Sequence, residues 1–114
     1  MSDDPVRDVF LGFLRLHILY HALDGPVFGV GLMHALQRQG YAVGPGTLYP
    51  TLHALERAGH LQSQEARVDS RARRVYRTTK HGAHALDDGR RRAEALLSAI
   101  RPARAPSRAR GVGE

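Results

Sequence analysis

Hydrophobic residues dominate positions 9–23 and leave only a narrow polar strip along that stretch. A helix that is apolar on almost all sides is buried inside its domain or against a second chain. The Asp-Gly-Pro sequence at residues 24–26 ends this helix, because glycine suits a left-handed cap and proline cannot continue the helix. The pattern predicts a central helix at residues 9–23, preceded by a flexible start at residues 1–8.

Two shorter amphipathic helices are expected next, at residues 29–39 and 45–58. The first closes at Gly40 and carries one apolar face, made of Leu32, Met33 and Leu36. The second buries a stripe spaced by four and then three residues, made of Leu48, Leu52 and Leu55. Gly44 can cap this second helix and Pro45 fits its first position, whereas Pro50 removes a backbone hydrogen bond and should bend it.

A basic hairpin and a long last helix complete the pattern. Residues 60–67 and 73–79 alternate imperfectly and predict two strands with a tip at residues 68–72. Thr79 is a good N-cap for a helix over residues 80–100. Helix, glycine and basic hairpin in this order are typical of a winged helix-turn-helix that binds DNA. The fold class is therefore α+β, mostly helical.

The last helix carries apolar residues at heptad intervals, which we call the heptad seam: Gly82, Leu86, Gly89, Ala93, Leu96 and Ile100. A seam of small and then large residues predicts close approach to another helix. Residues 101–114 are rich in proline, arginine and alanine and are expected to form a disordered basic tail.

Composition narrows the class of partner. The 114-residue chain carries a formal charge of +6, and arginine dominates from Arg57 onward. Such a charge favours nucleic acid first and an acidic membrane surface second, although a merely solubilising surface is an alternative. The chain has no cysteine, which excludes disulfides and thiolate sites. It has no phosphate loop, glycine-serine elbow or paired carboxylates beside an apolar pocket, so we expect no enzyme and no cofactor.

The N-terminal residues lack a signal-peptide pattern, and residues 9–23 are too short and too polar to span a bilayer. We therefore expect a cytoplasmic protein with no membrane partner.

The sequence Pro45-Gly46-Thr47-Leu48-Tyr49-Pro50, followed by residues 52–61 and 73–82, resembles the PadR family of winged-helix transcriptional regulators. The resemblance covers about residues 10–100. It implies a DNA-binding domain at residues 9–79, a dimerisation helix at residues 80–100, and a homodimer that binds a palindromic operator in double-stranded DNA, usually as a repressor. Two departures are Gly44, where the family often has serine, and a hairpin tip that is not glycine-rich.

On this basis we expect the second short helix to enter the major groove and the hairpin to lie near phosphates or the minor groove. The expected DNA contacts are Arg38, Gly46, Thr47, Tyr49, Pro50, His53, Arg57, Arg71, Arg73, Arg74 and Arg77. The recognition face of the helix itself offers few long side chains, namely Thr47, Tyr49, His53 and Arg57, so specificity should depend partly on thymine methyl groups and DNA shape. A solvated strand face is the alternative for the arginines. A protein–protein interaction module or a nonspecific DNA-binding protein is the alternative function.

Three further sets of residues complete the sequence hypotheses. Dimerisation is expected through Leu86, Gly89, Ala93, Leu96, Leu97 and Ile100. By analogy with the family, an unknown small-molecule effector would bind near Phe10, Phe13, His17 and Tyr20, with ordinary core packing as the favoured alternative. His17, His21 and Asp24 have the spacing of a metal site, but a structural role is the favoured interpretation.

Overall fold

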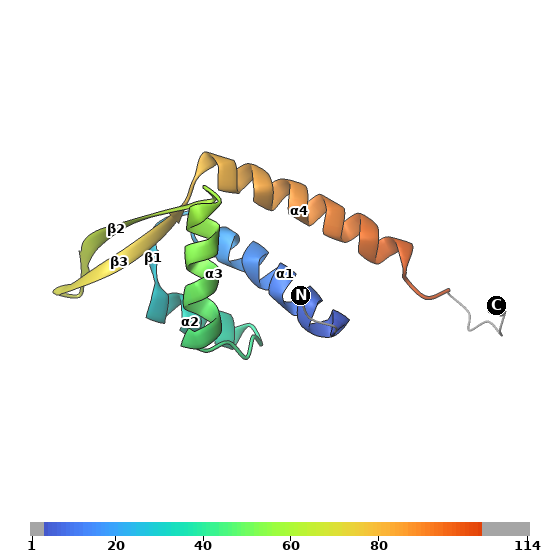
Figure 1. Cartoon of the computed structure of the whole chain (residues 1–114), viewed down its shortest axis with the longest axis horizontal. Helices are drawn as coiled ribbons and strands as arrows, with labels where there is room; N and C mark the ends of the chain where they lie inside the picture. The colour runs from blue at the N-terminus through green and yellow to red at the C-terminus, as the bar shows by residue number, and fades with distance from the viewer. Residues whose placement is uncertain (1–3, 104–114) are drawn as a thin grey trace.

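The computed structural model describes residues 4–103, which form four helices and three short strands (Figure 1). In chain order these are α1 (Pro5–His21), β1 (Val27–Phe28), α2 (Gly29–Arg38), α3 (Pro45–Arg57), β2 (Leu61–Val68), β3 (Arg71–Thr78) and α4 (Lys80–Ala99). The α+β, mostly helical class and the last helix are confirmed. No helix within these residues is long and apolar enough to cross a bilayer.

The first helix differs from its predicted bounds at both ends. It begins at Pro5, because Asp4 Oδ1 accepts a hydrogen bond of 3.0 Å from Val6 N and Pro5 occupies the first helical position. The expected flexible start is therefore wrong for residues 5–8. The helix ends at His21, which leaves Asp24 outside it. Most of the predicted basic tail, residues 104–114, lies outside the described residues.

The core forms where α1, α2 and α3 meet. Leu14 and Ile18 of α1, Leu36 of α2, and Leu48 and Leu52 of α3 are completely buried. The predicted all-round burial of α1 is only partly realised, because one side of the helix stays exposed in the single chain. In Figure 1, α4 begins near the end of α3 and runs antiparallel to α1.

The sheet has one strand that the hydrophobic pattern did not predict. Its order is β1-β3-β2, and the two-residue strand β1 pairs antiparallel with β3 through Val27 with Tyr76 and Phe28 with Val75. The hairpin itself is longer than predicted, because Val68 pairs with Arg71 across a two-residue turn. The expected five-residue tip at residues 68–72 is therefore wrong.

The turn residues Asp69 and Ser70 have φ values of 53° and 66°. Two consecutive left-handed residues are typical of the type I′ turn, whose twist matches that of the flanking strands. Arg67 Nη2 donates a 2.6 Å hydrogen bond to the Ser70 carbonyl and so ties the turn to β2. The hairpin projects away from the helices (Figure 1).

Thr79 joins the hairpin to α4 and confirms the predicted N-cap. Its Oγ1 accepts a 2.9 Å hydrogen bond from Gly82 N and donates one of 2.7 Å to the Gly59 carbonyl, while Thr79 N donates to the His60 carbonyl at 3.1 Å. A Cβ atom on Gly82 would overlap the His60 carbonyl oxygen. The start of α4 is therefore packed directly against the end of α3.

Two glycine substitutions test this close packing. Gly82→Ala should lower the free energy of unfolding by about 2 kcal/mol, because the new methyl group meets backbone that cannot move aside. Gly12→Ala, at an open position inside α1, should raise it by about 0.5–1 kcal/mol through helix propensity. Urea denaturation measures both. An unchanged stability for Gly82→Ala would contradict the close approach.

The same junction holds two histidine rings against each other. The ring centroids of His60 and His81 are 4.7 Å apart, with the planes tilted by 35°. Burial, and secondarily the charge of His81, lower the pKa of His60 below its ordinary value of 6.5. Protonation of His60 is therefore less favourable in the folded chain than in the unfolded one.

We expect the stability of the protein to fall on acidification because of His60. With a folded pKa below the unfolded one, this stability is present above about pH 6.5 and is lost as the pH falls through the folded pKa. The free energy of unfolding should drop less between pH 7.5 and 5.5 in His60→Gln than in the wild type. His34→Gln, on the exposed surface of α2, is the matched control and should keep the full drop. Equal drops in all three proteins would exclude this role for His60.

Candidate nucleic-acid interface

The outward face of α3 carries the residues that the hydrophobic stripe predicted. Leu48, Leu52 and Leu55 are buried, whereas the opposite side exposes Gly46, Pro50, His53 and Arg57. The helix continues through Pro50, and Thr51 Oγ1 donates a 2.7 Å hydrogen bond to the Thr47 carbonyl one turn earlier. The side chains on this exposed face are therefore mostly small or cyclic, and Arg57 is the one long basic side chain among them.

Tyr49 does not stand free on this face. It is half-buried, and its ring lies over Gly29 at the start of α2, where a Cβ atom would come within 2.8 Å of the Tyr49 Cζ. Gly29 is itself buried. The tyrosine thus fixes how α3 packs on α2, a role that the sequence did not reveal because no local pattern pairs it with a glycine twenty residues earlier.

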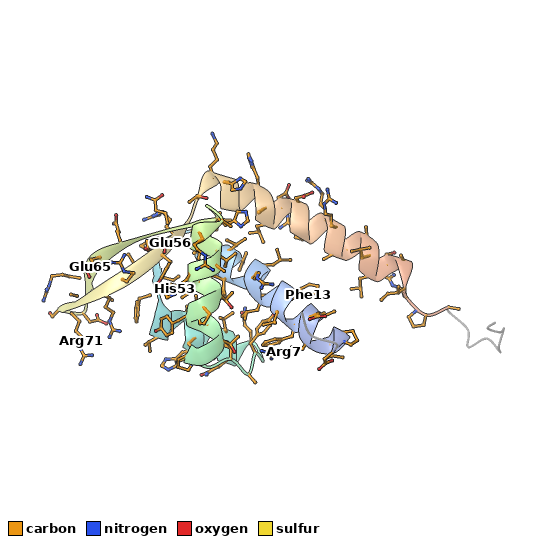
Figure 2. The ribbon with its side chains drawn as sticks, in the orientation of Figure 1. Arg7, Phe13, His53, Glu56, Glu65 and Arg71 are labelled. Carbon is orange, nitrogen blue, oxygen red and sulfur yellow. The ribbon has the colours of Figure 1, made fainter. Side chains whose placement is uncertain are left out.

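The four arginines of β3 have different environments. Arg71 and Arg77 are exposed, and Figure 2 shows Arg71 at the far end of the hairpin. Arg73 is half-buried, with its guanidinium carbon 4.5 Å from the centre of the Phe28 ring. Arg74 Nη1 donates a 3.1 Å hydrogen bond to Ser63 Oγ, and Arg74 Nη2 lies 3.9 Å from Glu65 Oε2. Within residues 4–103, Arg71 and Arg77 make neither an aromatic contact like that of Arg73 nor a hydrogen bond or ion pair like those of Arg74.

A chain of hydrogen bonds links α3 to the hairpin. Ser63 Oγ donates to Glu56 Oε2 at 2.7 Å and accepts from Arg74 Nη1, so Glu56 and Arg74 meet through one hydroxyl. Burial, and next the charge of Glu56, raise the pKa of Tyr76 beneath them. Sequence reasoning missed Glu56 and Ser63, because only the register of β2 brings them together. The bonds hold the outward face of α3 and the basic hairpin in one rigid arrangement.

The heptad seam divides into two halves with different environments. Leu86 is buried within its own chain, and a Cβ atom on Gly89 would come within 2.8 Å of Leu16 Cδ2 on α1. These two residues therefore pack inside the chain, and their part in a dimer contact stays a prediction. Ala93 is half-buried, whereas the end of α4 exposes Leu96, Leu97 and Ile100, at 69, 59 and 78%.

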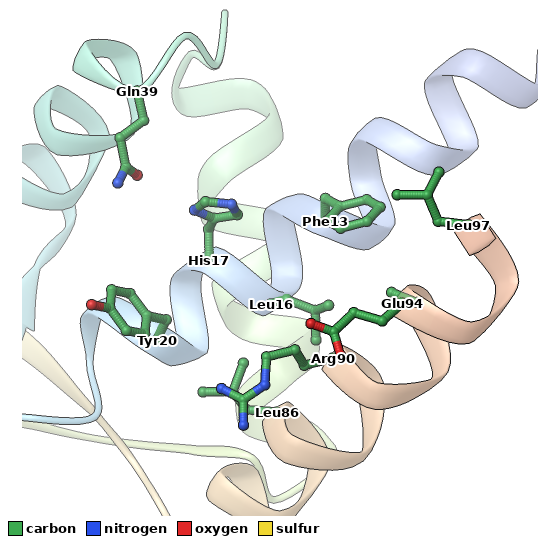
Figure 3. A pocket seen from close by; sticks show the side chains of 10 residues that line it. Phe13, Leu16, His17, Tyr20, Gln39, Leu86, Arg90, Glu94 and Leu97 are labelled. Atoms are coloured by element: carbon green, nitrogen blue, oxygen red, sulfur yellow. The ribbon is translucent and has the colours of Figure 1, made fainter. Parts of the chain in front are cut away.

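A groove of about 400 Å³ runs between α1 and α4 (Figure 3). Phe13, His17 and Tyr20 line it from α1, opposite Arg90 and other residues of α4. His17 Nδ1 is buried and has no hydrogen-bond partner within residues 4–103. Three of the four expected effector residues therefore lie together. The fourth, Phe10, is not among the lining residues; its ring packs on Tyr41 with centroids 5.3 Å apart.

The possible metal set is not assembled. The His17 ring packs on Tyr41 with centroids 4.9 Å apart, and His21 Nε2 donates a 2.9 Å hydrogen bond to Gln39 Oε1. Asp24 lies beyond the end of α1, so the helical spacing that suggested the site does not apply. The described part of the chain contains no group of three histidine, aspartate or glutamate side chains placed to hold a metal ion.

Comparison with known proteins identifies the family. Residues 18–88 match the transcriptional regulator PadR-like family. Transcriptional regulator Rv3488 of Mycobacterium tuberculosis is 50% identical over 95 residues, which cover 83% of this chain and 89% of that protein. The crystal structure of a PadR family transcriptional regulator from Eggerthella lenta superposes with a TM-score of 0.75 at 28% identity, covering 83% of this chain and 84% of that one.

A PadR-like transcriptional regulator from Bacillus cereus has the same TM-score of 0.75 at 21% identity, over 82% of this chain and 92% of that one, and so shares the fold. Together the matches show that this chain belongs to the PadR-like family of transcriptional regulators, whose winged helix binds DNA.

The packing of Tyr49 can be separated from DNA contact by its effect on stability. Tyr49→Ala should lower the free energy of unfolding by about 2 kcal/mol, because it empties the space over Gly29. Tyr49→Phe keeps the ring and should remain close to the wild type. His53→Ala, on the exposed face of the same helix, is the control and should change stability by less than about 0.5 kcal/mol. Chemical denaturation without DNA measures all three, and a stable Tyr49→Ala protein would argue against the packing role.

Proposed function

We propose that this regulator is a cytoplasmic repressor that binds a palindromic operator as a homodimer and is released by a small-molecule effector. The observation that carries the proposal is the exposed face of α3 beside a rigidly attached, arginine-rich hairpin. A helix of this width fits the major groove, and the hairpin would then lie along the neighbouring backbone.

The charges suit this placement. Arg57 at the end of α3 can pair with guanine, the commonest specific contact of arginine in the major groove. Arg71 and Arg77 are exposed on the hairpin and can neutralise phosphates, which releases counterions and supplies much of the affinity. Glu56, the carboxylate nearest to this face in sequence, is turned toward Ser63. The remaining contacts would be made by small side chains, which favours readout of DNA shape.

The proposed homodimer is supported by the apolar surface that one chain leaves open. Leu96, Leu97 and Ile100 at the end of α4 are exposed, and Phe13 and Tyr20 of α1 are exposed at 39 and 59%. Such a concentration on two helices is typical of an interface. A two-fold pairing through α4 would present two α3 helices to one face of DNA, with half-sites about one helical turn apart.

The effector is supported by the groove between α1 and α4. Its volume lies within the range of small-molecule sites, and its mainly apolar wall contains a few polar groups. His17 Nδ1, which has no hydrogen-bond partner within residues 4–103, offers an incoming ligand a hydrogen bond. Arg90 adds a positive charge to the opposite wall, although it is already paired with Asp87 at 2.8 Å. Ligand binding between these helices would act on the surface proposed to join the two subunits.

Selection from a random duplex library at near-physiological salt tests the function. We expect a palindrome with half-sites about ten base pairs apart and two chains per duplex by sedimentation. Arg71→Gln with Arg77→Gln should weaken binding to every duplex and reduce the salt slope by about one for each lost phosphate contact. Arg92→Gln, on α4 and paired with Asp88, is the control and should bind normally.

Other outcomes of the selection assign the alternative functions. Binding without sequence enrichment would indicate a nonspecific DNA-binding protein. Absence of binding to any duplex would favour a protein–protein interaction module and would count against operator recognition.

A further inference from the structure

A second hollow, of about 180 Å³, lies where β1 ends and α2 begins. Its walls come from three places: the residues around Gly29, Tyr49 of α3, and the stretch of β3 that includes Arg73 and Arg74. Arg73 and Arg74 are both among the residues that line this small space, and none of its lining residues carries a carboxylate. A hollow with this charge is suited to an anion.

The Arg73 side chain is held in place, but one of its hydrogen-bond donors has no acceptor within residues 4–103. The Phe28 ring, 4.5 Å from its guanidinium carbon, fixes the group by a cation–π contact, which leaves the guanidinium edge available for hydrogen bonds. Its Nε is buried and has no acceptor within residues 4–103. A buried donor without a partner costs free energy, and an anion bound in the hollow would bring acceptor oxygens to this guanidinium.

Arg74 and Tyr49 can complete the contacts. The ion pair of Arg74 with Glu65 is 3.9 Å long, and both side chains are more than half exposed, so the pair is weak and easily exchanged, while Arg74 Nη1 keeps its 3.1 Å hydrogen bond to Ser63 Oγ. The Tyr49 hydroxyl reaches the start of α2 only because Gly29 has no side chain. It adds a neutral donor beside the two charged ones.

The position of the hollow indicates which kind of anion it would bind. It lies between α3, proposed for the major groove, and the hairpin, proposed to lie along the neighbouring backbone. The sugar–phosphate strand that borders the major groove must therefore pass between these elements. A phosphodiester group on that strand matches the hollow in charge and in hydrogen-bond acceptors.

We propose that this hollow binds one backbone phosphate of each DNA half-site through Arg73, Arg74 and the Tyr49 hydroxyl. The assignment rests on the proposed function, since it needs α3 and the hairpin on DNA. In it Arg73 is a direct phosphate contact positioned by Phe28, and Gly29 is required so that the Tyr49 hydroxyl can reach the ligand.

The experiment places single neutral methylphosphonates along the selected duplex and measures the affinity of the full chain for each. One position per half-site should weaken wild-type binding about tenfold, because it removes the charge that the hollow holds. Arg73→Gln should bind the unmodified duplex about tenfold more weakly and should be nearly insensitive to that same modification. Arg92→Gln should keep the full sensitivity. Tyr49→Phe, which keeps the ring, should lose about threefold.

The possible outcomes distinguish a failure of this phosphate assignment from a failure of the proposed function. If the wild type binds no duplex, the proposed function fails. If it binds, but no phosphate is coupled to residue 73, the hollow is not a backbone site although the function stands. Should Arg73→Gln fail to fold in a thermal melt, Arg73→Lys and Tyr49→Phe carry the same scan. Inorganic phosphate that shifts the amide signals of Gly29 and Val30, without any coupled DNA position, would assign the hollow to free phosphate and overturn the DNA source.

Discussion

The whole arrangement depends on the buried hydrogen bonds at the base of the hairpin. Thr78 Oγ1 donates to the Leu19 carbonyl at 2.7 Å and Thr78 N donates to the Ala22 carbonyl at 3.0 Å, which ties β3 to the end of α1. The next residue, Thr79, ties the start of α4 to the end of α3. Thr78 is buried, so a lost partner would leave a polar group without water and would be costly. Two adjacent threonines thus orient the hairpin, the central helix and the last helix relative to one another.

Around that base, the two elements proposed to contact DNA form one unit. Glu56, Ser63 and Arg74 join α3 to the hairpin, while Tyr49 over Gly29 joins α3 to α2. Several polar residues that resemble free DNA contacts in the sequence are therefore partly engaged in holding the interface together. Preorganisation of this kind lowers the entropy lost on binding, so Glu56 and Ser63 can contribute to affinity without contacting DNA themselves.

The sequence predicted those features that depend on local patterns, namely the buried stripe of α3, the Thr79 cap and the order of helices and hairpin. It missed β1, because a two-residue strand forms only where β3 offers a free edge. It predicted that the heptad seam approaches another helix but not which one, because periodicity marks a face and does not say which helix covers it. The arginines of β3 looked equivalent until the register and the Phe28 ring distinguished them.

Because the heptad seam packs on its own chain mainly near the start of α4, a small rotation at that end moves the other end by a larger distance. Its first half is fixed to α1 and to the base of the hairpin, whereas Leu96, Leu97 and Ile100 toward its other end are largely exposed within residues 4–103. With 20 residues the helix is about 30 Å long, so a tilt of about 4° at the anchored end moves the far end by about 2 Å. The relation also holds in reverse, since a displacement imposed on the far end by a second subunit or by a molecule in the groove becomes a small rotation at the threonine base. A small rotation at Thr78 and Thr79 would also turn the hairpin, and the largest displacement within the hairpin would be at its tip.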